Sequence, residues 1–211
     1  MKISTFALAT LVSLIPLAAM DAAQATVLAP STAYSAYNYG PQGPNYAGTT
    51  GYGEITRLYE KFVLPTYAAD TAITSALFSF DISYSYNGAP DPLGLYTVAS
   101  DSWTTTTSWA DKAALGTLLS TVSYTSGASH YSIDVTSYIN SQYTTDGVAS
   151  LALAGVSEAL GKKSWVYFFG APAQLTFTVS PTSTSVPEPG SVALLGLGIA
   201  ALVAAARRRA R

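Results

Sequence analysis

Hydrophobic and polar positions alternate regularly along residues 76–84. Ala76, Phe78, Phe80 and Ile82 occupy every second position, and mostly polar residues lie between them. This period of two predicts a β-strand with one buried face, which the Gly- and Pro-containing residues 87–92 end. Other short segments rich in Thr, Val, Tyr and Phe predict strands at 55–64, 95–99, 118–124, 131–135, 148–154, 165–169 and 175–179.

Spaced strands of this kind predict an all-β domain over residues 54–180, an antiparallel sandwich or jelly roll whose first strand could begin near residue 31. Within this domain, helix is expected only in two short turns, one capped by Ser108 with Asp111 and one by Thr136. Residues 26–53 are rich in Tyr, Gly and Pro. Two interpretations of this segment stay open: a flexible arm, and an irregular first strand with a long loop.

The N-terminal residues 1–25 have the pattern of a secretory signal peptide. Lys2 precedes an apolar run over 6–20, and Ala23 and Ala25 form the small-x-small pattern of a signal peptidase site. A transmembrane or core helix fits less well, because the run is short and contains Pro16. We therefore expect signal peptidase to cut after Ala25, so that the mature chain begins at Thr26.

The C-terminus combines three elements in order. A linker over 181–190 contains Val186, Pro187, Glu188 and Pro189, residues 191–206 carry no charge, and the basic tail at 207–211 holds Arg207, Arg208, Arg209 and Arg211. Sixteen residues are short for a hydrocarbon core of about 30 Å, but flanking arginines can snorkel. The pattern predicts a single transmembrane helix at 191–206 with its basic end in the cytoplasm, and a permanent tail anchor is the plain alternative.

These three elements resemble the PEP-CTERM sorting signal of Gram-negative bacteria. The resemblance implies recognition by an exosortase, a membrane transpeptidase that cleaves near the Pro-Glu-Pro box. Val186, Pro187, Glu188 and Pro189 would then be a recognition motif without catalytic activity of their own. The protein would be exported by the general secretory route, held transiently in the inner membrane, and released to the cell surface or extracellular matrix.

The central residues resemble a second family, the DNRLRE or disaggregatase-related domain grouped with carbohydrate-binding modules. The matching segments keep the family's order over about 140 residues: 38–40 (NYG), 59–63 (YEKFV), 73–77 (ITSAL), Trp103 with 108–109 (SW), 134–139 (DVTSYI) and 172–175 (PAQL). The chain departs from the family pattern at Glu60, Val63 and Ser108. The resemblance implies a jelly-roll fold and an accessory, glycan-related role, with no catalytic residues.

Composition and charge narrow the function. The chain has no Cys, which excludes a disulfide scaffold, a Cys-based zinc site and a cysteine nucleophile. Residues 26–185 hold five basic and ten acidic residues, a net charge of −5. This acidic balance disfavours nucleic acid and polyanionic glycans, so a neutral glycan is the easier ligand.

Few residues suggest chemistry. His130 is the only His, and it is expected on the surface because no nucleophile elbow or second metal ligand accompanies it. Asp134 is expected to accept hydrogen bonds from backbone amides at a turn. Asp91, Asp101 and Asp146 could offer oxygens to a structural Ca²⁺, although no EF-hand loop is present. We predict no catalytic site, no metal site of recognisable pattern and no cofactor.

Aromatic side chains are the candidates for glycan contact, since sugars stack on flat apolar rings. Trp103, in a polar run, is the first choice for an exposed platform, followed by Tyr84, Tyr86 and Tyr96. Trp109 and Trp165 are assigned to the core.

Three functions remain open. The first is a non-enzymatic surface or matrix protein whose module contacts exopolysaccharide or matrix components. The second is a coat or biofilm component that assembles through its Tyr-rich arm. The third, a polysaccharide hydrolase or lyase, has no residue pattern in its favour.

Overall fold

The computed structural model describes residues 23–40, 45–50, 52–68, 71–85, 91–124, 129–159, 163–168, 172–182, 196–199, 205 and 207–208. Within these ranges the chain forms strands and one helix of more than one turn. The elements are β1 (Gln24–Leu28), β2 (Thr32–Tyr37), β3 (Tyr46–Thr49), β4 (Ile55–Val63), β5 (Thr71–Ile82), β6 (Tyr84–Ser85), β7 (Leu93–Val98), β8 (Leu115–Val122), β9 (Ser129–Asp134), α1 (Thr136–Tyr143), β10 (Val148–Gly155), β11 (Val166–Tyr167) and β12 (Gln174–Pro181).

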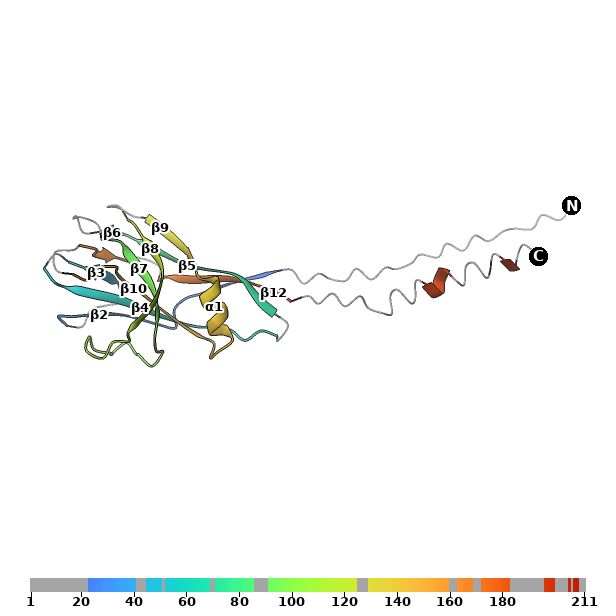
Figure 1. Cartoon of the computed structure of the whole chain (residues 1–211), viewed down its shortest axis with the longest axis horizontal. Helices are drawn as coiled ribbons and strands as arrows, with labels where there is room; N and C mark the ends of the chain where they lie inside the picture. Colours follow the sequence, from blue (N-terminus) through green and yellow to red (C-terminus); the bar gives the residue numbers. More distant parts are fainter. Residues whose placement is uncertain are drawn as a thin grey trace.

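The strands form two antiparallel sheets (Figure 1). The smaller sheet has the order β1-β12-β5-β9, and the larger has the order β6-β11-β3-β4-β10-β7-β8 with β2 paired to β4. All strand pairs between described residues are antiparallel. The predicted all-β, antiparallel class is therefore confirmed, while the jelly-roll topology stays a prediction.

The main core lies between the two sheets. Ala76, Phe78, Phe80 and Ile82 of β5 are buried, as the alternation predicts. Phe78 meets Phe62 of β4 edge to face, with 6.1 Å between the ring centres, so side chains of both sheets share one core.

A second, smaller core covers the outer face of the larger sheet. It consists of Tyr34, Ala36, Tyr59, Trp103 and Ala152. Tyr34 and Tyr59 are paired across β2 and β4, and their rings stack at 5.0 Å. The loop of residues 99–114 between β7 and β8 supplies Trp103 and folds over them, which positions this loop beside β2.

The Tyr-rich segment of residues 26–53 is built into the sheets, so the interpretation as a flexible arm was wrong and the alternative of a first strand with a loop is the nearer one, although the segment holds more than one strand. The segment contributes most of β1 and all of β2 and β3. The reason is non-local pairing: β1 adds to β12, and β2 and β3 both add to β4. The hydroxyl of Ser35 also donates to the carbonyl of Tyr46 at 2.9 Å, which ties β2 to β3.

The two predicted turns form, with differences in their caps. Helix α1 begins at Thr136, but its N-cap is Val135, and the Thr136 hydroxyl instead accepts a hydrogen bond from the Ala76 amide of β5 at 2.8 Å. Ser108 and Asp111 do close a turn, through Ser108 Oγ to Asp111 Oδ2 at 2.6 Å. No helix follows this turn, because β8 begins at Leu115.

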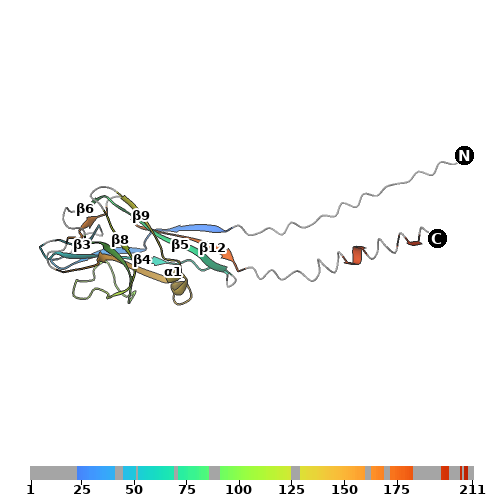
Figure 2. The same ribbon diagram turned by 45° about the horizontal axis from the view of Figure 1, so that its top comes forward.

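Most of the two predicted targeting segments lies outside the described residues. The described chain begins at Ala23, and Gln24 and Ala25 start β1, where they pair with Val179 and Thr178 of β12. The start of β1 and the end of β12 therefore lie side by side at one end of the domain (Figure 2).

The sorting motif at Val186–Pro189 lies outside the described residues, as do Arg209 and Arg211. Of the predicted helix at 191–206, only 196–199 and 205 are described, and these are helical, as are Arg207 and Arg208. Among the residues that the structure describes, no helix has the length and apolar character needed to span a membrane.

Candidate binding site

A cleft of about 510 Å³ lies between β2 and the loop 99–114. One wall is formed by the end of β2 and the turn that follows it, and the other by the tip of the loop. The lining residues are Tyr34, Ser35, Ala36, Tyr37, Asn38 and Gly40 on the first side and 105–110 on the second. This cleft therefore joins two segments that lie about 70 residues apart in the sequence.

Trp109 lines the cleft as a partly buried side chain whose ring is held by two cations. The Lys112 ammonium lies 3.9 Å from the ring centre and donates a hydrogen bond to the Trp109 carbonyl at 3.1 Å. The Arg57 guanidinium lies 5.4 Å from the ring centre. Both contacts fall within cation–π range, so the ring is fixed in place while part of it faces the cleft.

The two cations beside Trp109 differ in their pairing. Arg57 forms a bidentate ion pair with Glu158, and among the described residues Lys112 makes no ion pair. Burial, and then the positive charge of Arg57, lower the pKa of Lys112. Both cations lie behind the lining of the cleft, whose described residues carry no charge.

Trp103 is not the exposed platform that the polar run 101–105 suggested. Only 4% of it is exposed, and its ring lies 5.1 Å from Tyr34 and 5.9 Å from Tyr59. The physical reason is that the outer face of the larger sheet carries this aromatic pair, and Trp103 covers it. The Lys61 ammonium lies 4.4 Å from the Trp103 ring and donates to the Trp103 carbonyl at 2.9 Å, closing the other side.

Hydroxyl groups surround Trp109 on the loop. Thr105, Thr106 and Ser108 are exposed and line the cleft. The turn holds itself together, because the Thr104 amide donates to the Thr107 hydroxyl at 2.8 Å. These hydroxyls give the cleft several donors and acceptors beside an aromatic ring.

Asn38 has a structural role in the opposite wall. Its Nδ2 donates to the Gly53 carbonyl at 2.8 Å, and its Oδ1 accepts from the Ile55 amide at 2.9 Å. Both ends of the amide are thus used to fix the turn after β2 against the start of β4.

Of the other predicted aromatic contacts, Tyr96 does not line this cleft. Tyr96 is only partly exposed on β7, burial raises its pKa, and its ring lies over Gly94 of the same strand. The Tyr84 side chain and all of Tyr86 lie outside the described residues. Trp165 is buried as predicted, whereas the assignment of Trp109 to the core holds only in part, since this residue packs against the second core and also lines the cleft. No local sequence pattern indicates that Trp103 is buried and that Trp109 lines the cleft.

The titratable residues have structural roles. His130 is exposed, as predicted, and its Nδ1 lies 2.7 Å from Asp81. Asp134 accepts from the Thr136 amide at 2.8 Å, which confirms the predicted turn, and the hydrogen bonds of Thr136 lower its pKa. Asp91 accepts from the Ser157 amide at 2.8 Å.

Asp146 likewise accepts from the Val148 amide, at 3.0 Å. Across the described ranges, no three side chains of His, Cys, Asp or Glu come together in the manner of a metal site. The structural Ca²⁺ suggested for Asp91, Asp101 or Asp146 stays a prediction.

Glu60 is a carboxyl group that the sequence did not single out for chemistry. It lies on β4 between the core residues Leu58 and Phe62, and only 4% of it is exposed. Its Oε2 has no hydrogen-bond partner, and burial raises its pKa to about 8, against the opposing effect of a hydrogen bond from the Ala173 amide. It lines no part of the cleft.

Comparison with known families gives two matches. Residues 19–167 match the model of carbohydrate-binding module family 96, and residues 185–209 match the PEP-CTERM protein-sorting motif. A comparison with curated proteins found no match. Both resemblances read from the sequence, a carbohydrate-binding type of module and a PEP-CTERM motif, are thereby confirmed.

The motif is the signal of an exosortase-processed surface protein, and all described residues that line the cleft fall within the module. Because the first match spans well over half of the sequence, this chain belongs to carbohydrate-binding module family 96 and carries a PEP-CTERM sorting motif at its C-terminal end.

Proposed function

We propose that this chain is a non-enzymatic surface or matrix protein that holds exopolysaccharide in the cleft between β2 and the loop 99–114. The observation that carries the proposal is Trp109, a tryptophan fixed by two cations and partly open to the cleft. Exosortase processing near the Pro-Glu-Pro box would deliver the module to the cell surface or matrix.

The binding mechanism follows from the lining residues. A sugar ring stacks its apolar face on Trp109, because an indole offers a flat apolar surface. The hydroxyls of Thr105, Thr106 and Ser108 then exchange hydrogen bonds with the sugar hydroxyls. Since the ring and the turn are held in place before the ligand arrives, little side-chain entropy is lost on binding.

The lining also supports a binding role over hydrolysis. Glycoside hydrolysis uses a pair of carboxyl groups on either side of the scissile bond. Among the described residues that line the cleft there is no Asp or Glu. Glu60, the carboxyl group with the raised pKa, is enclosed in the core and cannot reach a sugar from there.

The described lining of the cleft carries no charge of either sign, so it selects neither for nor against an acidic glycan. Arg57 and Lys112 lie beside Trp109 but outside this lining, and Arg57 is paired with Glu158. Neutral and uronate-containing polysaccharides therefore both belong in the test.

Assembly through a Tyr-rich arm, the alternative function, loses the feature on which it depended. β2 and β3 are integral strands of the larger sheet. A deletion of residues 26–53 would unfold part of the domain and would not report on assembly.

The test is retention of the purified full-length chain on a panel of immobilised polysaccharides, including exopolysaccharide from the source cells. We expect the wild type to bind at least one of them and Trp109→Ala to lose that binding. Tyr52→Ala is the matched control, because Tyr52 is 80% exposed and lines none of the clefts described above. Retention of Trp109→Ala at the wild-type level would refute the proposed site.

A further inference from the structure

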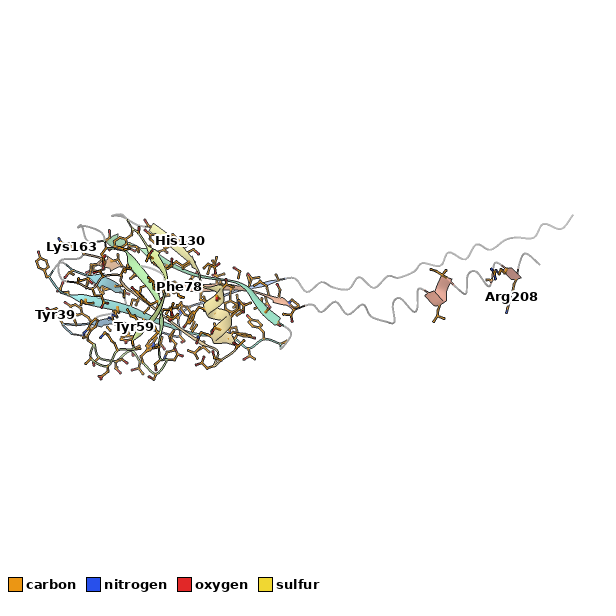
Figure 3. All side chains as sticks on the ribbon, in the orientation of Figure 1. Tyr39, Tyr59, Phe78, His130, Lys163 and Arg208 are labelled. Carbon is orange, nitrogen blue, oxygen red and sulfur yellow. The ribbon has the colours of Figure 1, made fainter. Side chains whose placement is uncertain are left out.

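A row of aromatic side chains continues outward from the cleft. Its members, which we call the aromatic strip, come from β2 and its turn, from β3 and from the short strand β11 with the residue before it: Tyr39, Tyr37, Trp165, Tyr46 and Tyr167. Successive ring centres lie 5.8, 6.2, 5.4 and 4.1 Å apart in that order. The five rings thus form a continuous row of aromatic contacts, and Figure 3 places Tyr39 at one end of the domain.

The core of the sandwich does not require most of these rings. Val166 of β11 and Ala47 of β3 are fully buried and pair with one another in the main core. Tyr46 and Tyr167 are the neighbouring pair, so they point to the opposite face and are only partly buried. Tyr39 is 68% exposed, and Trp165, at 8%, is the buried support of the row.

Tyr37 belongs both to the cleft and to the aromatic strip. It lines the cleft at the end of β2, and its ring also contacts Tyr39 and Trp165. Its hydroxyl donates to Glu54 Oε1 at 2.8 Å. Burial and this hydrogen bond raise its pKa to about 12. The ring at the junction is therefore held in one position and makes the two surfaces continuous.

We propose that the aromatic strip extends the cleft into a track for several consecutive sugar units of one polysaccharide chain. This inference rests on the proposed function, because it assumes that the first sugar lies on Trp109. On this inference the ligand is a long glycan chain that binds along its length. A single sugar, or the end of a chain held in a closed pocket, would not use the strip.

The chemistry of the strip favours a glycan over a second copy of this chain. Protein interfaces have a desolvated apolar centre surrounded by a polar rim. The partly exposed members of the strip are all tyrosines, each with a flat apolar face and a hydroxyl at its edge. A sugar ring offers apolar faces and hydroxyl groups in alternation, so both parts of a tyrosine side chain can contact it. The exposed large aliphatic side chains of the domain, such as Val63, Leu77 and Leu118, lie on other strands.

The experiment measures affinity against chain length. The probes are size-graded oligosaccharides prepared by partial hydrolysis of the source cells' exopolysaccharide, titrated into the full-length chain. We expect affinity to rise with length in the wild type, and the double variant Tyr46→Ala/Tyr167→Ala to keep its affinity for short fragments. For long fragments this variant should lose about tenfold, the loss expected from two stacked rings.

Three controls keep the outcomes separate. Trp109→Ala should weaken short and long fragments alike, and if it does not, the proposed function fails before the strip is tested. Tyr46→Phe/Tyr167→Phe should retain the gain with length, and Tyr52→Ala should behave as the wild type. Tyr39→Ala removes an exposed ring at the end of the row, so it gives a second test if the double variant does not fold.

The inference is overturned if the double variant and Tyr39→Ala both keep the full gain in affinity with chain length. It is also overturned if either variant changes the sedimentation of the protein without changing its affinity for long fragments. The strip would then be a contact between copies of the chain.

Discussion

Arg57 on β4 and Glu158 after β10 meet in two parallel hydrogen bonds of 2.7 Å each, beside the ring of Trp109. Their side chains are only 16% and 22% exposed, so the pair is shielded from water. The two parallel hydrogen bonds hold the guanidinium of Arg57 in one orientation relative to the carboxylate of Glu158. Glu158, which lies 101 positions after Arg57 in the sequence, thus helps to hold the guanidinium against the ring that lines the cleft.

Breaking this pair is expected to affect both stability and glycan binding. Glu158→Gln leaves Arg57 without its charged partner and frees it to move from Trp109. We expect a loss of roughly 1–3 kcal/mol in the free energy of unfolding, between the values for exposed and buried pairs. Chemical denaturation measures the stability, and retention on the polysaccharide measures the binding. We expect both to be lower in Glu158→Gln than in the wild type.

The control is Asp81→Asn, which breaks the His130–Asp81 pair. The side chains of His130 and Asp81 are 65% and 52% exposed, so we expect Asp81→Asn to change neither the free energy of unfolding nor the retention on the polysaccharide measurably. Equal effects of the two substitutions would contradict the role given to the Arg57–Glu158 pair.

Glu60 predicts a specific dependence of stability on pH. Its pKa is raised from 4.5 to about 8 in the folded protein, with burial as the main cause. Between these values the unfolded chain has released the proton and the folded chain still holds it. The free energy of unfolding contributed by this group therefore falls as pH rises from about 4.5 to about 8, by at most about 1.4 kcal/mol per pH unit.

Glu60→Gln tests this directly, because Gln keeps an oxygen for the Ala173 amide but cannot ionise. The difference in unfolding free energy between variant and wild type should be smallest near pH 4, grow in favour of the variant up to about pH 8, and then level off. Denaturant titrations at several pH values give this difference. A difference that stays constant across the range would show that Glu60 does not titrate in the folded chain.

Gly48 on β3 is expected to tolerate no side chain. Its φ is +108°, and a Cβ at this position would collide with the backbone carbonyl of Ser164. Gly48→Ala should therefore cost roughly 2–4 kcal/mol of unfolding free energy, since backbone strain and overlap add. Gly147→Ala is the matched control: its φ is +72°, but the nearest atom to a Cβ there is 3.9 Å away. Thermal unfolding should rank Gly48→Ala as clearly the less stable of the two.

The sorting motif predicts how the chain is processed. Replacing Pro187, Glu188 and Pro189 by Ala should leave the C-terminal segment attached and the protein in the membrane fraction. Mass spectrometry of the two termini measures this and also tests the predicted start at Thr26. Normal processing of the variant would mean that the Pro-Glu-Pro box is not the element recognised.

The sequence predicted the parts of this protein that depend on local pattern. The alternation along β5 predicts which of its side chains are buried, and the order of the C-terminal elements predicts the sorting motif. The turn at Asp134 follows from the same kind of local rule.

What could not be predicted depends on pairing between distant segments. The strands β1, β2 and β3 form because β12 and β4 offer them edges, which residues 26–53 do not reveal by themselves. Trp103 is buried because Tyr34 and Tyr59 create an aromatic outer face to be covered. Trp109 is left in the cleft for the same reason, since Trp103 already fills the space beneath the loop.

Trp109 is the residue that we propose to contact the sugar. The most direct measurement is isothermal titration of the polysaccharide that the wild type retains into the wild type, Trp109→Phe and Trp109→Ala. We expect Phe to keep part of the affinity and Ala to lower it by about tenfold or more, measured at a temperature at which both variants remain folded. Wild-type affinity in a folded Trp109→Ala protein would contradict it.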